Sequence, residues 1–187
     1  MNLPASVEGR ERLRLFCALR LPPAAVDGLV GWQREAFRDT QGVRIVDREQ
    51  LHVTLAFLGS RPGEELVAIA GELVAAARAA SVPTLTVRRY RETRSVGMLV
   101  CDDEQDRAKA LAEGLHERLE RLGVYERERR PWLPHLTVIR FRARPRLQPP
   151  LPELGPVVTS EAAVYMSVLR PSGAQYEVLQ SVAVGRR

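Results

Sequence analysis

Lysine is nearly absent from this chain of 187 residues, in which Lys109 stands against 27 arginines. The formal net charge is +5 and the pI is near 9.8. Guanidinium groups pair with phosphate oxygens in a bidentate way that ammonium groups do not, so this charge suits a polyanionic partner. A bias in overall composition explains the excess slightly better. It explains less well a cluster within twenty residues that contains Arg127, Arg129, Arg130, Arg140, Arg142, Arg144 and Arg146.

Long hydrophobic runs are also missing. Arginines flank the apolar run 15–19, and residues 1–9 lack the apolar region of a signal peptide. The two cysteines, Cys17 and Cys101, lie in apolar runs, which indicates small buried side chains rather than a disulfide framework. We therefore expect a cytoplasmic protein without a membrane partner. The composition, 45% hydrophobic and 27% charged, predicts one globular domain over residues 1–187, and we expect a monomer.

Apolar residues at helical spacing predict three helices, at residues 22–37, 63–80 and 104–122. Prolines open the first helix, and Asp103 is the expected N-cap of the third. His116 falls beside Leu115 on the third helix. We expect it at the solvent edge of that amphipathic helix and assign it no role.

Short apolar or alternating runs predict strands at 13–19, 43–46, 51–58, 85–90, 96–101, 135–141, 157–169 and 174–184. Five prolines make residues 142–156 an irregular connection, and Pro171, Ser172 and Gly173 form the turn of a closing hairpin. A strand, a helix and a second strand recur in each half, which indicates an internal duplication. We predict an α+β fold with two pseudo-symmetric lobes of antiparallel sheet, helices on the outer faces and a central cleft. A doubly wound parallel sheet is the alternative.

Two of the three histidines are followed two residues later by threonine, in the pairs His52/Thr54 and His135/Thr137. With seven threonines in the chain, this coincidence is expected by chance about once in 240. Side chains two apart on a strand share one face and lie about 7 Å apart, so each pair projects to one side. Alternation places Val53, Leu55 and Phe57 on the other side. If the duplication relates the two strands by a two-fold axis, both pairs line the central cleft.

Two imidazoles and two hydroxyls are sufficient for phosphoryl transfer without a metal. A neutral histidine removes a proton from the nucleophile, and a protonated histidine gives a proton to the leaving oxygen. An unperturbed histidine titrates at about 6.5, so both forms are accessible near neutral pH. Threonine hydroxyls and a nearby arginine donate hydrogen bonds to the phosphate oxygens and stabilise charge in the transition state.

Two other interpretations of the H-x-T pairs compete with a role in phosphoryl transfer. Histidine and threonine occur in many sheets for structural reasons alone, but the matched position of both pairs in equivalent halves argues against this. A zinc site requires further His, Cys or carboxylate ligands at suitable spacing, and neither pair has them. We therefore expect no metal and no cofactor.

The segments H-V-T-L at residues 52–55 and H-L-T-V at 135–138 resemble the twin signatures of the 2H phosphoesterase superfamily. L-F-C-A-L near the start, R-P-W-L-P before the second motif and G-A-Q-Y-E-V-L near the end are similar to the RNA 2′,3′-cyclic phosphodiesterases, formerly called 2′-5′ RNA ligases. The resemblance extends from residue 13 to residue 184. It implies a two-lobed α+β fold and an RNA partner that ends in a 2′,3′-cyclic phosphate.

In this family the cyclic phosphate is hydrolysed to a 2′-phosphate. The resemblance implies that His52 protonates the leaving 3′-oxygen and that His135 activates water, although the sequence alone does not fix this direction. It also implies that Arg140 holds the phosphate. Simple alternation places Arg140 on the face opposite His135, so a strand end or a bulge must turn it around. Arg130, in the loop before the second motif, is a second candidate to bind the phosphate.

Some alternatives remain open at this point. Phe16, Trp132 and Tyr176 are candidates to stack on a terminal base, although core packing explains all three. The same chemistry on a small nucleotide, such as a cyclic phosphate of ADP-ribose, is a second hypothesis. A 2′-5′ ligation as a side activity uses the same groups. A non-catalytic module that binds RNA ends is a hypothesis from a different class.

Overall fold

A computed structural model describes residues 7, 11–170 and 173–185 of the chain. Its helices are α1 (Pro23–Ala36), α2 (Leu66–Ala79) and α3 (Arg107–Arg121). Its strands are β1 (Arg12–Arg20), β2 (Val43–Ile45), β3 (His52–Pro62), β4 (Thr84–Glu92), β5 (Val96–Asp103), β6 (His135–Phe141), β7 (Val157–Val158), β8 (Glu161–Arg170) and β9 (Gly173–Ala183). The turn expected at Pro171 and Ser172 lies outside the described residues.

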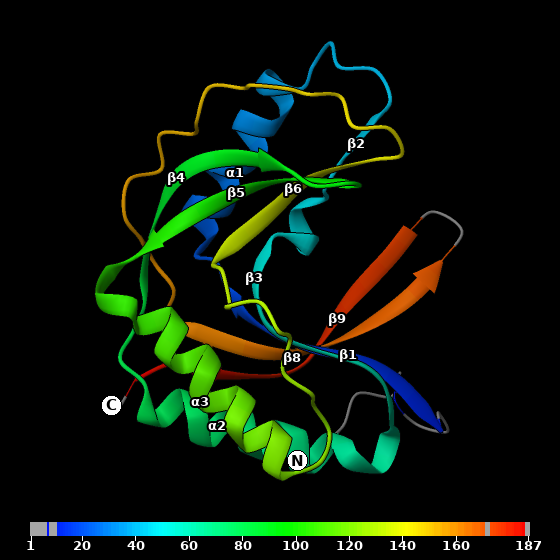
Figure 1. The fold of residues 1–187 in the computed structure, drawn as a ribbon, viewed down its shortest axis with the longest axis vertical. Helices are drawn as coiled ribbons and strands as arrows, with labels where there is room; N and C mark the ends of the chain where they lie inside the picture. Colours follow the sequence, from blue (N-terminus) through cyan, green and yellow to red (C-terminus); the bar gives the residue numbers. More distant parts are fainter. Residues whose placement is uncertain (1–6, 8–10, 171–172, 186–187) are drawn as a thin grey trace.

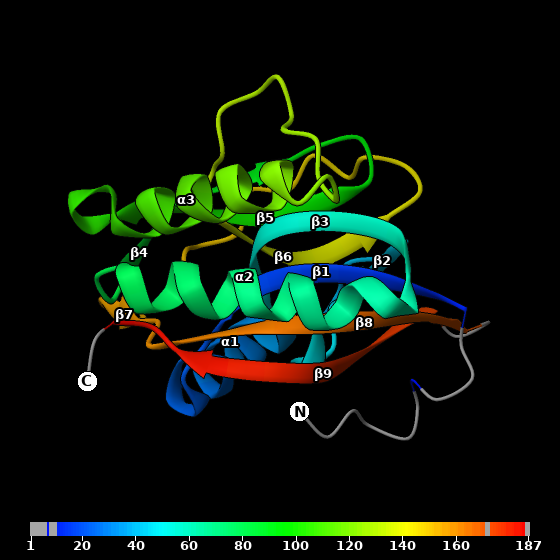
Figure 2. The ribbon, with the colours of Figure 1, turned by 90° about the horizontal axis from the view of Figure 1, so that it is seen from below.

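All the strand pairs are antiparallel, so the doubly wound parallel sheet is wrong and the predicted α+β class is confirmed. The order is β7-β4-β5-β6-β3-β1-β8-β9, with β2 added beside β6. The two motif strands, β3 and β6, therefore lie at the centre. They pair through Val53 and Leu136, each of which directly follows a motif histidine. The sheet curls strongly to either side of this junction (Figures 1 and 2).

The three helices cover the outer faces of the sheet. Helix α1 lies behind β4 and β5, and α2 and α3 lie side by side against the other part of the sheet (Figures 1 and 2). The core includes Leu29 of α1, Leu73 of α2 and Leu115 of α3, all at most 1% exposed. Among the described residues, no helix is long and apolar enough to cross a membrane.

Helix α3 begins later than the sequence predicts, because Gln105 and Asp106 have positive φ angles of 57° and 53°. Residues Glu104–Asp106 form a 3₁₀ turn instead. The expected capping role of Asp103 is nevertheless present: its carboxylate accepts hydrogen bonds from the amides of Ala108 at 3.0 Å and Lys109 at 2.8 Å. These amides belong to the first turn of α3, where backbone donors lack partners within the helix.

His116 is buried, so its expected place at the solvent edge is wrong. It is 4% exposed, and its Nε2 donates a hydrogen bond to the carbonyl of Leu55 in β3 at 2.8 Å. Helix α3 contacts both α2 and β3, and this second contact covers a side of the helix that the apolar pattern of the sequence does not reveal.

The irregular connection predicted for residues 142–156 contains no helix or strand, but one buried carboxylate holds it in place. Glu92, with a side chain only 2% exposed, accepts hydrogen bonds from Arg144 Nε at 3.1 Å and from the amides of Arg146 at 2.9 Å and Leu147 at 2.7 Å. The hydroxyl of Tyr90 also donates to it, at 3.2 Å. Burial by itself raises the pKa of Glu92, but these donors outweigh burial and the net shift is downward.

We expect Glu92→Gln to lower the free energy of unfolding by about 1–3 kcal/mol, because the amide places a donor against groups that themselves donate. Urea denaturation at pH 7 measures the loss. Since the folded-state pKa of Glu92 lies below its unfolded value, the stability it provides is present above that value and shrinks as the pH falls through the folded pKa. The matched control is Asp102→Asn, which breaks only an exposed ion pair with Arg88. Equal losses for both variants would contradict the anchoring role of Glu92.

Candidate active site

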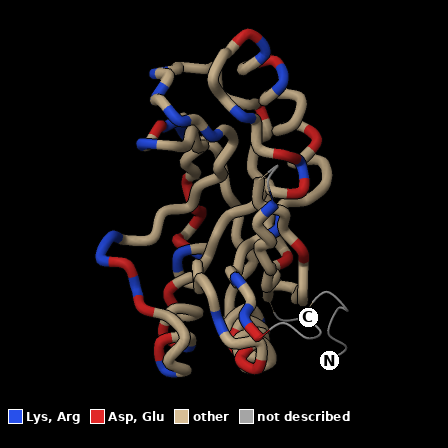
Figure 3. The backbone as a smooth tube through the Cα atoms, turned by 90° about the vertical axis from the view of Figure 1, so that its right-hand side faces the viewer, with Lys and Arg blue, Asp and Glu red and all other residues tan. Residues whose placement is uncertain are grey.

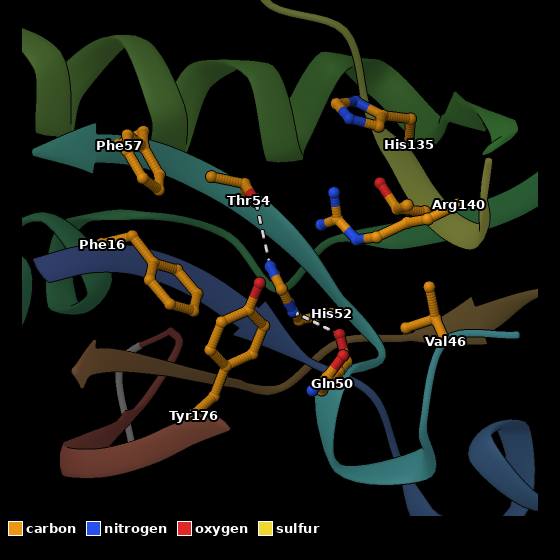
Figure 4. A pocket seen from close by; sticks show the side chains of 10 residues that line it. Phe16, Val46, Gln50, His52, Thr54, Phe57, His135, Arg140 and Tyr176 are labelled. Carbon is orange, nitrogen blue, oxygen red and sulfur yellow. Dashed lines mark hydrogen bonds between the residues drawn. The ribbon is translucent and has the colours of Figure 1, made fainter. Parts of the chain in front are cut away.

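A cavity of about 140 Å³ opens where the two motif strands separate. The side chains that line it come from β1, β3, β6, β9 and the segment before β3: Phe16, Val46, Gln50, His52, Thr54, Phe57, His135, Thr137, Arg140 and Tyr176. Both H-x-T pairs therefore face one cavity. Figure 4 shows Arg140 extending from β6 toward the space between the two histidines.

Both imidazoles are held in the same tautomer by the same kind of contact. His52 Nδ1 donates to the carbonyl of Gln50 at 2.7 Å, and His135 Nδ1 donates to the carbonyl of Leu133 at 2.8 Å. Each acceptor lies two residues before its histidine. Because a carbonyl only accepts, the proton is on Nδ1 in both neutral rings, and Nε2 is left for a reacting group. In His52, this Nε2 accepts a hydrogen bond from the hydroxyl of Thr54 at 3.1 Å (Figure 4).

Burial lowers the pKa of His52 to about 4. The hydrogen bond to Gln50 opposes this shift, while the electrostatic influence of His135 and the positive charge of Arg140 add to it. The ring of His52 packs at centroid distances of 4.9 Å from Phe16 and 5.5 Å from Tyr176. His52 is therefore neutral at pH 7 in the unliganded protein.

A β-bulge follows each H-x-T pair. In β3, neighbouring residues of β1 pair with Thr54 and Ala56, so Leu55 is an extra residue between them. In β6, neighbouring residues of β5 pair with Thr137 and Ile139, so Val138 is the extra residue. An extra residue reverses the alternation of side chains beyond it.

The second bulge turns Arg140 to the same side as His135, which is the correction to simple alternation that a position in the cavity requires. The first bulge does the same to Phe57. The prediction that Phe57 faces away from the H-x-T side is wrong, because this residue is 50% exposed and lines the cavity. Simple alternation fails at Phe57 because the strand is not regular between Thr54 and Ala56.

The remaining candidates from the sequence have different surroundings. Arg130 is not among the lining residues; its side chain is 88% exposed and lies 3.7 Å from the carboxylate of Glu128. Trp132 is outside the cavity as well, and its Nε1 donates to the carbonyl of Thr54 at 3.0 Å. Phe16 and Tyr176 do line the cavity, with their rings 4.9 Å apart in an edge-to-face arrangement.

Within the described ranges, no group of three or more His, Cys, Asp or Glu side chains is placed to hold a metal ion. The polar groups of the cavity come from two imidazoles, two threonine hydroxyls, the Gln50 amide, the Tyr176 hydroxyl and one guanidinium. Apart from Gln50 and Tyr176, these are the groups expected from the sequence to serve phosphoryl transfer.

An antiparallel α+β fold with two H-x-T strands meeting at one cavity defines a 2H phosphoesterase. Residues 22–170 match the model of the 2′-5′ RNA ligase superfamily, and the chain belongs to this superfamily.

Three known proteins illustrate the similarity. The RNA 2′,3′-cyclic phosphodiesterase of Thermus thermophilus is 34% identical over 181 residues, which cover 92% of this chain and 90% of the relative. A protein of the same name from Methanocaldococcus jannaschii is 23% identical over 176 residues, covering 90% of this chain and 99% of the relative. The apo crystal structure of E. coli LigT superposes with a TM-score of 0.81 at 26% identity, covering 95% of this chain and all of LigT; LigT has also been solved with 3′-AMP.

The neutral state of His52 is directly testable. In the unliganded protein, long-range ¹H–¹⁵N correlation spectra are expected to show His52 as the neutral Nδ1–H tautomer down to a pH of about 4. Arg140→Met should raise this pKa, because it removes a positive charge that disfavours the imidazolium. The exposed Arg88→Gln is the matched control and should leave the titration unchanged. Titration of His52 near 6.5 in the wild type would contradict the burial argument.

Proposed function

We propose that this protein hydrolyses the 2′,3′-cyclic phosphate at the end of an RNA to a 2′-phosphate, without a metal, by acid–base catalysis between His52 and His135. The observation that carries the proposal is that both motif histidines, both threonines and Arg140 line one cavity, with Nδ1 of each histidine bonded to a backbone carbonyl. Two relatives that match nine-tenths of the chain are named RNA 2′,3′-cyclic phosphodiesterase, which supports the substrate class.

In the proposed reaction, His135 Nε2 takes a proton from a water molecule, whose oxygen attacks phosphorus and forms the new P–O bond. The bond between phosphorus and the 3′-oxygen breaks, and His52 Nε2 gives that oxygen a proton. The products are a 2′-phosphate monoester and a free 3′-hydroxyl, so one water is consumed and the proton count balances. Arg140 pairs with the nonbridging oxygens, where negative charge builds up in the transition state.

This assignment requires His52 to be protonated in the complex, although it is neutral in the unliganded protein. A bound phosphate supplies the reason for the change, because an anion within a few ångströms favours the imidazolium and neutralises the effect of Arg140. Protonation also turns Nε2 from an acceptor into a donor. The hydroxyl of Thr54, which donates to Nε2 in the free protein, is then released to donate to the phosphate.

The same chemistry on a small cyclic nucleotide is a second candidate, and one observation favours it. Several arginines of the cluster that suggested a polymer are engaged away from the cavity: Arg127 pairs with Glu120, Arg130 with Glu128 and Arg144 with Glu92. In Figure 3, acidic and basic residues alternate along the projecting loop between α3 and β6. Of the cluster, only Arg140 lines the cavity.

We expect the wild type to convert an oligonucleotide that ends in a 2′,3′-cyclic phosphate to a 2′-phosphate, with EDTA present. His52→Ala and His135→Ala should each lower kcat by about 10²–10⁴-fold, because each removes one proton transfer. Chromatography after treatment with a phosphatase specific for 3′-phosphates identifies the product, since a 2′-phosphate survives it. Arg88→Gln is the control expected to retain activity. Full turnover by either alanine variant would remove the acid–base proposal, and a 3′-phosphate product would reverse the two roles.

Chain length separates the two candidate substrates. If RNA is the substrate, kcat/KM should rise from a cyclic mononucleotide to an oligonucleotide, and the rise should weaken at high salt because phosphate contacts release counterions. Kinetics at several salt concentrations measure this. Equal kcat/KM for both lengths at every salt concentration would favour the small cyclic nucleotide, while tight end binding without turnover would favour a binding module.

A further inference from the structure

Two buried side-chain donors, one on α1 and one on α3, occupy equivalent places in the two halves of the chain. Gln33 is 1% exposed and His116 is 4% exposed. Gln33 precedes the first motif histidine, His52, by 19 residues, and His116 precedes the second, His135, by the same 19 residues (52 − 33 and 135 − 116). Neither side chain reaches the cavity, and the proposed reaction uses neither.

Each donor bonds to the motif strand of the opposite half. Gln33 Nε2 donates to the carbonyl of Val138 in β6 at 2.8 Å, and His116 Nε2 donates to the carbonyl of Leu55 in β3 at 2.8 Å. Both carbonyls belong to the third residue after a motif histidine. Both are therefore the extra residues of the two bulges. Each half thus supplies a donor to the bulge of the other half. This is the arrangement expected if the two halves arose by duplication and kept the same packing.

The bulges explain why donors are needed at these points. An extra residue interrupts the ladder of backbone hydrogen bonds, and the loss of a donor to a buried carbonyl is costly. Leu55 is 2% exposed and Val138 is not exposed at all, so water does not reach these groups. Gln33 also donates to the carbonyl of Val46 at 3.1 Å, while the amide of Val46 donates to Val138 at 3.0 Å. Gln33 thereby ties the bulge to a residue that lines the cavity.

The side chains that the bulges redirect are the fifth residues after the motif histidines, Phe57 and Arg140, and both line the cavity. We propose that Gln33 and His116 are positioning residues: Gln33 holds the bulge that turns Arg140 into the cavity, and His116 holds the bulge that turns Phe57 into it. This inference deepens the proposed function and rests on it for its kinetic test.

Gln33→Met keeps the length of the side chain and removes the donor. We expect it to lower kcat/KM for the cyclic phosphate by about tenfold or more, in the same direction in kcat and KM as Arg140→Met. The double variant should be little worse than Arg140→Met alone, because Gln33 acts through Arg140 and neighbouring effects are not additive. A general loss of folding would instead lower the active fraction in both backgrounds by the same factor.

The two halves supply matched controls for each other. His116→Gln and Gln33→His each replace one N–H donor by the donor found at the equivalent position of the other half. We expect kcat/KM of both variants to stay within about threefold of the wild type. His116→Leu removes the donor and should reproduce the kcat and KM changes of Phe57→Ala, with no further loss in the double variant. If Gln33→Met does not fold, the His116 series decides the proposal by itself.

Additive losses in both double variants would overturn the inference. So would crystal structures of Gln33→Met and His116→Leu in which the bulges persist and Arg140 and Phe57 still line the cavity. Those structures do not depend on turnover. A wild-type protein that fails to hydrolyse the cyclic phosphate would remove the proposed function, and the direction of Arg140 and Phe57 in the variants would still decide this inference separately.

Discussion

The cavity depends on bringing to one face of each motif strand two residues that a regular strand would place on opposite faces: the threonine two positions after the histidine and the residue five positions after it. A strand shows every second side chain to the same face, so the histidine and threonine of an H-x-T pair share a face but the fifth residue after the histidine does not. Yet His135, Thr137 and Arg140 all line one cavity. One extra residue in the strand resolves the conflict, because it reverses the alternation between the threonine and the fifth residue. The same solution occurs in β3.

The bulges also mark the limit of what the sequence predicts. Hydrophobic periodicity locates the three helices and the motif strands, and spacing alone identifies the two H-x-T pairs that line the cavity. Periodicity fails at Phe57, because a bulge is defined by the register of a neighbouring strand, β1, which is distant in the chain. It fails at His116 for a related reason: the face of α3 that contacts β3 carries a polar residue with a partner across the fold. Both errors come from long-range contacts, which a local pattern does not contain.

Pseudo-symmetry gives the cavity two similar walls, and their differences make it asymmetric. Equivalent carbonyls fix Nδ1 of His52 and His135, so the two rings begin from the same tautomer. The fifth residue is an aromatic ring in one half and a guanidinium in the other. His52 in addition packs against Phe16, Tyr165 and Tyr176, which removes it from water and lowers its pKa. Two copies of one strand motif thus have different surroundings on the two sides of the cavity.

The net charge of the chain says less about its ligand than the surroundings of each arginine do. A net charge of +5 and a cluster of arginines around the second motif both suggest a long polyanion. In the fold, however, Arg127 pairs with Glu120 and Arg144 pairs with Glu92. The second pair helps to hold the connection 142–156 in place. The arginine that lines the cavity is the one that a bulge turns inward. In the proposed function, Arg140 therefore binds the phosphate because of the backbone geometry of β6, whereas a preference for a longer RNA has to come from contacts outside the cavity.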